Sequence, residues 1–461
     1  MRTLHWRSRE AERFVAEARG VEIPPPRHPG PGDVERFLEV RDALPPALAA
    51  AVAAHLARGV AEGVLDPTRR WLAKRWAEPV RIERDETRTR RALAELWGGP
   101  EPARGEAVLA ALRDRLRIDV ERLTAAKARA ARAAGELWAR LGTERHPDAG
   151  PEPDARRASA QHVLSTSEDL RGAALEALGE PTTLVELTRA LRWREGDRDA
   201  PTRDRYRRVG RTWAALEAEL AQKVRVDASH AQPRVEPHVV ILTSSKDVRI
   251  LPSPVELGWQ SERAAAAAVG RALALVLSAP PVAFARPTAQ TLARAFGELG
   301  AQIWADAHRA RGDGLSSVDA ARRARMHAAR SVLELRLHAA SVEMGFVVPR
   351  TGGWDDRGED LDSVAESLVA QALGVSVPAS IARLWIHTPS GGGARLRAAL
   401  GGLRLWVGLR EHFDRDWYRN PRAEETLREL AAPGGGSCIE DACAPLAGED
   451  AWRARLEELL T

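Results

Sequence analysis

Apolar residues recur at helical spacing over most of this 461-residue chain, and that periodicity constrains the fold more than any other feature. Leucine, valine, alanine and tryptophan at positions i, i+3, i+4 and i+7 predict helices over residues 34–230 and again from residue 262 onward. Loops rich in proline, glycine and aspartate, such as RHPGPGD and RHPDAGPEPDA, separate these segments. The pattern therefore predicts a mainly α protein, and no fixed-period repeat indicates a solenoid.

One stretch departs from the helical pattern. Residues 237–254 read PHVVILTSSKDVRILPSP, in which the β-rich runs HVVILT and VRILP are joined by the polar SSKD. This arrangement predicts a hairpin and one small sheet. We place a domain boundary just before it, which gives a helical N-terminal region over residues 1–235 and a region of short strands followed by helices over residues 236–461.

The charge pattern excludes several partners. Lys and Arg number 69 against 65 Asp and Glu, and the arginines are spread beside glutamates instead of forming one basic stripe, so we expect no nucleic-acid partner. The N-terminal MRTLHWRSREAERF lacks the apolar core of a signal peptide, and no run of about eighteen apolar residues occurs. We expect a cytoplasmic protein without a membrane partner.

A family resemblance begins after the hairpin. The segment VRILPSPVELGWQSERAAAAAVGRALA is predicted to form a strand, a glycine-containing loop and a helix. In the family that shares this order and these lengths, the motif helix has a glycine, an alanine and a leucine at the positions of Gly270, Ala272 and Leu273. The chain resembles the HExxH zinc metallopeptidases of the thimet oligopeptidase and carboxypeptidase-like gluzincin group. A later segment is similar to the C-terminal segment of that family's sequences; it reads LRAALGGLRLWVGLREHFDRDWYRNPRAEETLRELAAPGG. The resemblance covers residues 237–432 and implies a two-lobed, helical, zincin-type scaffold with one small β-sheet.

The residues that carry chemistry in that family differ here. In this register the first zinc histidine corresponds to Ala267, the general-base glutamate to Ala268 and the second histidine to Arg271. The downstream glutamate ligand corresponds to Glu298, and the tyrosine that stabilises the oxyanion corresponds to Arg395. Alanine offers zinc no lone pair and accepts no proton, and a guanidinium stays charged and repels a cation. The resemblance thus implies no zinc, no other cofactor and no catalytic residue.

The same register generates a hypothesis about charge. Arg271 lies one helical turn beyond Ala267 and should project toward the position of the missing zinc. We therefore predict a buried ion pair between Arg271 and Glu298, because an unpaired buried carboxylate is costly. A Glu298 that is simply a solvated helix residue is the alternative. Arg271, Glu298 and Arg395 are the candidate binding residues of the former cleft, where two guanidinium groups would hold an anion or a peptide carboxylate.

No other catalytic or metal-binding constellation stands out in the sequence. The acidic loop at residues 353–362 lacks the residue order of an EF-hand, so it indicates weak calcium binding at most. The glycine-rich PSGGGAR at residues 389–395 follows a helix and is as consistent with a flexible linker as with a phosphate-binding loop. The histidines and cysteines lack the spacing of a zinc site; those considered are His308, His327, His338, His412, Cys438 and Cys443.

Three functional interpretations follow. The first is a catalytically inactive metallopeptidase-like protein, a pseudopeptidase, that binds a peptide or protein or serves as a structural or regulatory partner of an active HExxH-containing paralogue. The second is an active metallopeptidase or other hydrolase with atypical ligands. The third is a helical interaction protein that does not use the cleft.

Overall fold

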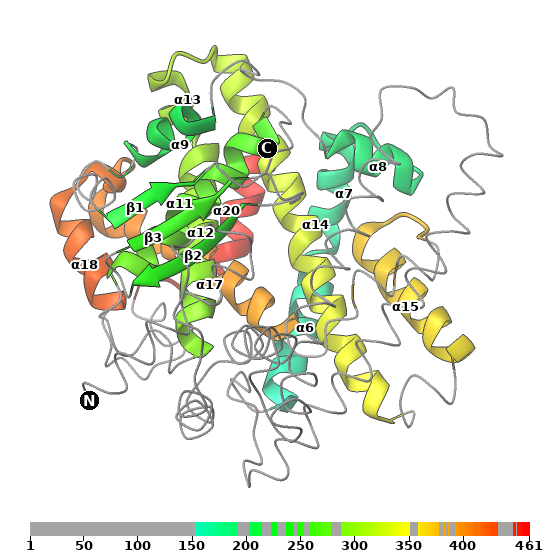
Figure 1. Cartoon of the computed structure of the whole chain (residues 1–461). Helices are drawn as coiled ribbons and strands as arrows, with labels where there is room; N and C mark the ends of the chain where they lie inside the picture. The colour runs from blue at the N-terminus through cyan, green and yellow to red at the C-terminus, as the bar shows by residue number, and fades with distance from the viewer. Residues whose placement is uncertain are drawn as a thin grey trace, which may run out of the picture.

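The computed structural model describes residues 153–461 apart from several short stretches, and Figure 1 shows the arrangement of the described elements. Within this range the structure does not describe residues 192–201, 212, 214–222, 228–236, 244–246, 253–258, 278–286, 351–357, 378–381, 383–385, 387–391, 432–445 and 449. The helices expected between residues 34 and 152 lie outside the described residues, as do Cys438, Cys443 and residues 353–357 of the acidic loop. Residues 358–362 of that loop are helical and begin α15.

Helices dominate the described part, as the sequence predicted. Before the sheet lie α6 (Pro153–Thr166), α7 (Glu168–Ala177), α8 (Leu184–Ala190) and α9 (Thr202–Gly210). After it come α11 (Trp259–Leu277), α12 (Pro287–Ala305), α13 (Ala307–Gly312), α14 (Ser317–Arg350), α15 (Gly358–Leu373), α17 (Gly392–Phe413), the 3-10 helix η4 (Trp417–Arg419), α18 (Pro421–Ala431) and α20 (Ala451–Leu460). The mainly α class with one small sheet is confirmed. None of these helices is long and apolar enough to cross a bilayer.

The sheet is the predicted hairpin with one added strand. Strand β2 (His238–Thr243) pairs antiparallel with β3 (Asp247–Leu251), and β1 (Val224–Val226) pairs in parallel with the other edge of β3. Val248 and Ile250 of β3 are buried and belong to the core that α11 shares. The prediction of helix up to residue 230 was wrong at β1, because its pairing with a strand more than twenty residues away is a tertiary contact that local periodicity does not contain.

One residue interrupts the helical region that the periodicity predicted after residue 262. Helix α12 ends at Ala305, and α13 begins at Ala307. Asp306 separates them, since its side chain accepts a hydrogen bond of 2.8 Å from the backbone N–H of Arg309 and so caps α13. The C-terminal helix α20 buries Trp452, Leu456 and Leu460.

The described residues form two hydrophobic cores on either side of the long helix α14 (Figure 1). One core combines α6, α7, α8, α15 and α20 with α14, and the other combines the sheet with α11, α12, α17 and α18. Helices α6 and α7, from the predicted N-terminal region, pack directly on α14. The boundary proposed at residue 235 is therefore crossed by extensive packing, while its status as a domain boundary stays a prediction.

A buried arginine on α14 joins three neighbouring helices of the first core, the one that contains α6, α7 and α15. Arg336 of α14 is fully buried, and its guanidinium donates to the carbonyl oxygens of Leu164 at 2.8 Å and Ala372 at 3.0 Å. It also donates to the carbonyl oxygen of Gln371 and to the carboxylate of Glu168. Because the carbonyl groups near a helix C-terminus lack intrahelical partners, this one side chain satisfies the ends of α6 and α15 and joins both to α14.

We expect Arg336→Met to lower the free energy of unfolding by about 3 kcal/mol or more, because the buried carbonyl groups and the ion pair lose their donor together. Arg207→Met, at an exposed position of α9, is the matched control and should change stability by no more than about 0.5 kcal/mol. Urea denaturation of both variants measures the difference. Equal urea midpoints for the two variants would show that Arg336 does not stabilise this core.

Candidate functional site

Helices α11 and α12 approach each other so closely that their backbones touch. A Cβ atom on Gly270 would collide with the carbonyl oxygen of Phe296, and one on Gly300 would lie 2.5 Å from that of Ala266. A Cβ on Gly297 would lie 3.0 Å from the carbonyl oxygen of Ala267. Only glycine permits this approach. The two backbones are therefore in contact where the resemblance places Ala267 of the HExxH motif next to the helix that carries Glu298.

Helix α17 completes the contact from another side. A Cβ on Gly402 would lie 2.5 Å from the Cβ of Glu298 and 2.7 Å from the carbonyl oxygen of Ala295. Glu298 is thus held where α11, α12 and α17 meet, with little room for its backbone to move.

Two of the three motif positions on α11, Ala267 and Arg271, share a helical face because they are four residues apart. Ala268 is fully buried, whereas Ala267 and Arg271 are partly buried. The Cγ of Arg271 covers Gly297, and its Nη2 donates 3.2 Å to the carbonyl oxygen of Pro237, directly before β2. The side chain of Arg271 therefore contacts both α12 and the residue that precedes the sheet.

The guanidinium opposite Glu298 belongs to Arg263. Its Nη2 lies 3.7 Å from Glu298 Oε2, while Gln302 donates 3.1 Å to Glu298 Oε1. The predicted ion pair between Arg271 and Glu298 was wrong, because the arginine that faces Glu298 is Arg263. The reason is helical geometry, because eight residues along a helix correspond to about 12 Å and a rotation of about 80°, which turns Arg271 toward the sheet.

Arg263 also links α11 to α14. Its Nε donates to His327 Nδ1 at 3.1 Å, and its Nη2 donates to Glu334 Oε2 at 2.9 Å. Arg330 donates 2.7 Å to the other oxygen of Glu334. We call the set of Arg263, Glu298, His327 and Glu334 the Arg263 cluster.

Burial and charge shift the pKa values in the Arg263 cluster in different directions. Burial raises the pKa of Glu298, and the nearby Arg263 opposes this. Burial also favours a higher pKa for Glu334, but the guanidinium groups of Arg263 and Arg330 outweigh it and lower the pKa. Burial, followed by the charge of Arg263, lowers the pKa of His327, so this imidazole is neutral near pH 7.

The tautomer of His327 follows from its partner. Arg263 Nε can only donate, so Nδ1 must carry the lone pair and the proton lies on Nε2. Nε2 is buried without a hydrogen-bond partner and lies 4.0 Å from Glu298 Oε1. The acceptor atom of His327 is therefore directed at the Arg263 guanidinium.

His338 lies one helical turn after Glu334, close enough for its charge to act on that carboxylate, whereas the other sequence candidates lie apart from the cluster. Arg395 occupies the first turn of α17, seven residues before Gly402, which places it about 10 Å along the helix from the contact with Glu298. His308 is exposed, and His412 Nδ1 lies 2.9 Å from the carbonyl oxygen of Gly408. Within the part of the chain that the structure describes, no three His, Cys, Asp or Glu side chains are placed to hold a metal ion.

Sequence reasoning did not single out Arg263 or Glu334, and it considered His327 only as a lone histidine. A signal for Arg263 existed, because it lies one turn before Ala267 and so on the same side of the helix. Glu334 and His327 lie on α14, and only tertiary packing brings them to α11.

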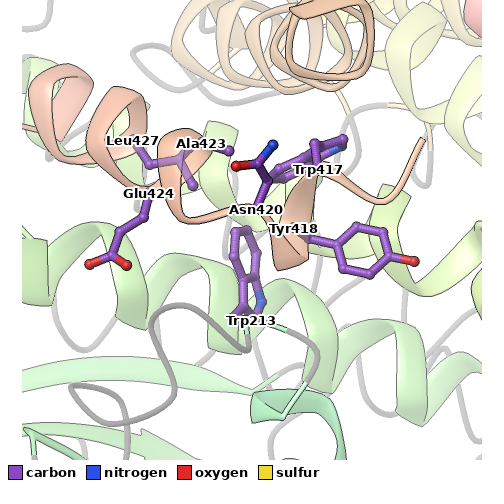
Figure 2. A pocket seen from close by; sticks show the side chains of 7 residues that line it. All are labelled: Trp213, Trp417, Tyr418, Asn420, Ala423, Glu424 and Leu427. Atoms are coloured by element: carbon purple, nitrogen blue, oxygen red, sulfur yellow. The ribbon is translucent and has the colours of Figure 1, made fainter. Parts of the chain in front are cut away.

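A small hollow lies elsewhere in the second core (Figure 2). It has room for about one water molecule. Trp213 and Trp417 form its aromatic wall in an edge-to-face pair with ring centroids 6.0 Å apart. The remaining lining residues are Tyr418, Asn420, Ala423, Glu424 and Leu427. The hollow contains none of the motif positions.

We expect Gly270→Ala to destabilise the protein by several kcal/mol, because the new methyl group would displace α12 at Phe296. Gly172→Ala is the matched control, since nothing lies within 4 Å of a Cβ at this exposed position of α7, and it should stabilise by roughly 0.5–1 kcal/mol. Thermal unfolding of both variants is the measurement. A Gly270→Ala protein as stable as the wild type would contradict the close packing of α11 on α12.

Comparisons with known proteins agree with this arrangement at the level of fold. No protein-family model and no curated protein sequence matches the chain. A solved structure assigned as an oligoendopeptidase F superimposes with a TM-score of 0.57 and 13% identity, covering 98% of this chain and 83% of the other. Metallocarboxypeptidase 1 of Trypanosoma cruzi gives a TM-score of 0.55 with 14% identity, covering 99% of this chain and 98% of the other. The chain therefore has a metallopeptidase-like, helical zincin-type fold.

Proposed function

We propose that this chain is a pseudopeptidase, a metallopeptidase-like protein that does not hydrolyse peptides and acts by binding a peptide or protein segment. The observation that carries the proposal is the Arg263 guanidinium, which lies beside Glu298 where the resemblance assigns a zinc ligand. A cytoplasmic location and an active HExxH-containing paralogue as partner belong to the same proposal.

The residues at the expected metal positions do not fit zinc. Ala267 and Ala268 have no donor atoms, and Arg271 has only donor N–H groups and a positive charge. The one carboxylate of the set, Glu298, already faces a cation. The closed contact between α11 and α12 at Ala267 and Gly297 removes room as well. We therefore assign no zinc-dependent step to this protein.

The sheet offers a surface for binding. Within the described residues, β2 pairs with β3 along one side only, and its outer edge carries no further strand. An edge of this kind presents backbone N–H and C=O groups to an extended peptide, which adds to the sheet as another strand. Helix α11 packs beneath β2 and β3, so the edge is supported by a rigid element.

Metal analysis and a hydrolysis assay test the lack of catalysis directly. Wild-type protein purified without chelators should contain no stoichiometric zinc and should not cleave a mixture of unstructured peptides. One zinc per chain together with peptide cleavage would establish the alternative of an active peptidase with atypical ligands. Binding is tested by titrating an extended peptide library, with a proline placed in β2 at Val240 as the edge-disrupting control.

Restoring the motif tests whether the scaffold can still hold zinc. The variant A267H/A268E/R271H carries the residue types of the HExxH motif. Because α11 and α12 touch at Ala267 and Gly297 and Glu298 already faces Arg263, we expect this variant to take up no more zinc than the wild type in equilibrium dialysis. Stoichiometric zinc in the folded variant, lost again when Glu298→Gln is added, would contradict this expectation and support the register at Ala267.

A further inference from the structure

One histidine at the contact between α11 and α14 can keep its hydrogen bond only as a neutral imidazole. The side chain of His327 is fully buried, and its Nδ1 accepts a hydrogen bond of 3.1 Å from Arg263 Nε. A guanidinium has donors and no acceptor, so a proton on Nδ1 would meet a second donor and break this bond. We propose that His327 is an acid-sensitive switch, and that its protonation opens the Arg263 cluster between α11 and α14.

The other ring nitrogen gives a protonated imidazole no compensation. Nε2 is buried without a hydrogen-bond partner, and Glu298 Oε1 lies 4.0 Å from it, beyond hydrogen-bond distance. Trp304 packs against the imidazole edge to face, with ring centroids 6.3 Å apart, and its indole has a donor and no acceptor. A positive charge on His327 would therefore lose its hydration without gaining a hydrogen bond in this packing.

The charges around His327 come from four helices, α11, α12, α14 and α20. The carboxylates are Glu298 and Glu334, and the guanidinium groups are those of Arg263, Arg330 and Arg455. Both carboxylates already face Arg263. Burial, followed by the charge of Arg263, lowers the pKa of His327 well below its ordinary value. A further cation is thus disfavoured by every guanidinium group near it.

The direction of the pH dependence follows from these contacts. In the unfolded chain His327 takes up a proton as the pH falls through about 6.5, whereas in the folded protein it stays neutral. Opening of the cluster is then accompanied by uptake of one proton, and its equilibrium constant rises by up to about 10-fold for each further unit of pH. The stability that depends on neutral His327 is fully present above this pH and is lost on acidification.

Two carboxylates of the cluster titrate differently and have to be separated from His327. Glu298, whose pKa is raised by burial, binds its proton more tightly in the folded protein and so opposes the effect of His327. Glu334, whose pKa is lowered despite its burial, adds to the acid sensitivity only near and below its ordinary pKa of 4.5. A comparison of the wild type with a variant that lacks the imidazole isolates His327, because both proteins contain the two carboxylates.

The test compares the wild type with His327→Asn between about pH 5 and about pH 7.5. Asparagine places its amide oxygen close to the position of Nδ1, so it still accepts from Arg263 and has no titratable group. In urea unfolding, the wild type should lose stability relative to His327→Asn below about pH 6.5, by up to about 10-fold in the unfolding constant per unit of pH. His308→Asn, at an exposed position of α13, is the matched control and should keep the pH dependence of the wild type.

Hydrogen exchange shows where the protein opens. Amide groups of α11 should lose protection in the wild type on acidification, after correction for the intrinsic exchange rate, and should keep it in His327→Asn. Helix α15 belongs to the other hydrophobic core and should keep its protection in both proteins. Neither experiment involves peptide or zinc, so the result is independent of the proposed function.

A stability difference between the wild type and His327→Asn that does not change with pH overturns the proposal. If His327→Asn does not fold, His327→Gln is the second variant, since its amide also accepts without titrating. Nitrogen NMR of the wild type with labelled histidine needs no variant. One imidazole should stay neutral, with its proton on Nε2, wherever the protein is folded. Ordinary titration of all twelve histidines in the folded protein would overturn the proposal as well.

Discussion

The contact of α11 with α12 through glycine is the constraint on which the rest of this structure depends. Gly270, Gly297 and Gly300 allow the two helical backbones to touch, and Gly402 brings α17 against the same place. Helices separated by ordinary side chains lie 8–10 Å apart, as measured between axes. The closer approach holds the backbone at Glu298 against α17 and brings its neighbour Gly297 against Ala267 of α11.

The electrostatics of the interior follow from this closure. A carboxylate held between three helices needs a cation, and Arg263 supplies it from the same helix that carries the motif positions. The guanidinium also binds His327 and Glu334, so the compensation of one charge joins α11, α12 and α14. A single internal side chain therefore cross-links three helices of this core.

The sequence predicted the elements of this site better than their partners. Helical periodicity located α11 and α12, and the β-rich runs located the hairpin of β2 and β3. The predicted partner of Glu298, Arg271, was wrong, because periodicity could not distinguish Arg263 from Arg271. Both arginines lie on α11 within reach of α12, and the choice depends on which side of α11 faces α14. Strand β1 was missed for a similar reason, because its partner is distant in the chain.

The sequence by itself determined the helical class, the position of the sheet and the absence of metal donors at Ala267, Ala268 and Arg271, because these depend on residue type and local spacing. Only the tertiary structure decided which charges meet. Glu298 and Arg263 lie on adjacent helices, whereas His327 and Glu334 come from a helix that follows later in the chain. Ion pairing between helices depends on their relative rotation to within a fraction of a turn, and that rotation is set by packing of side chains across the whole core.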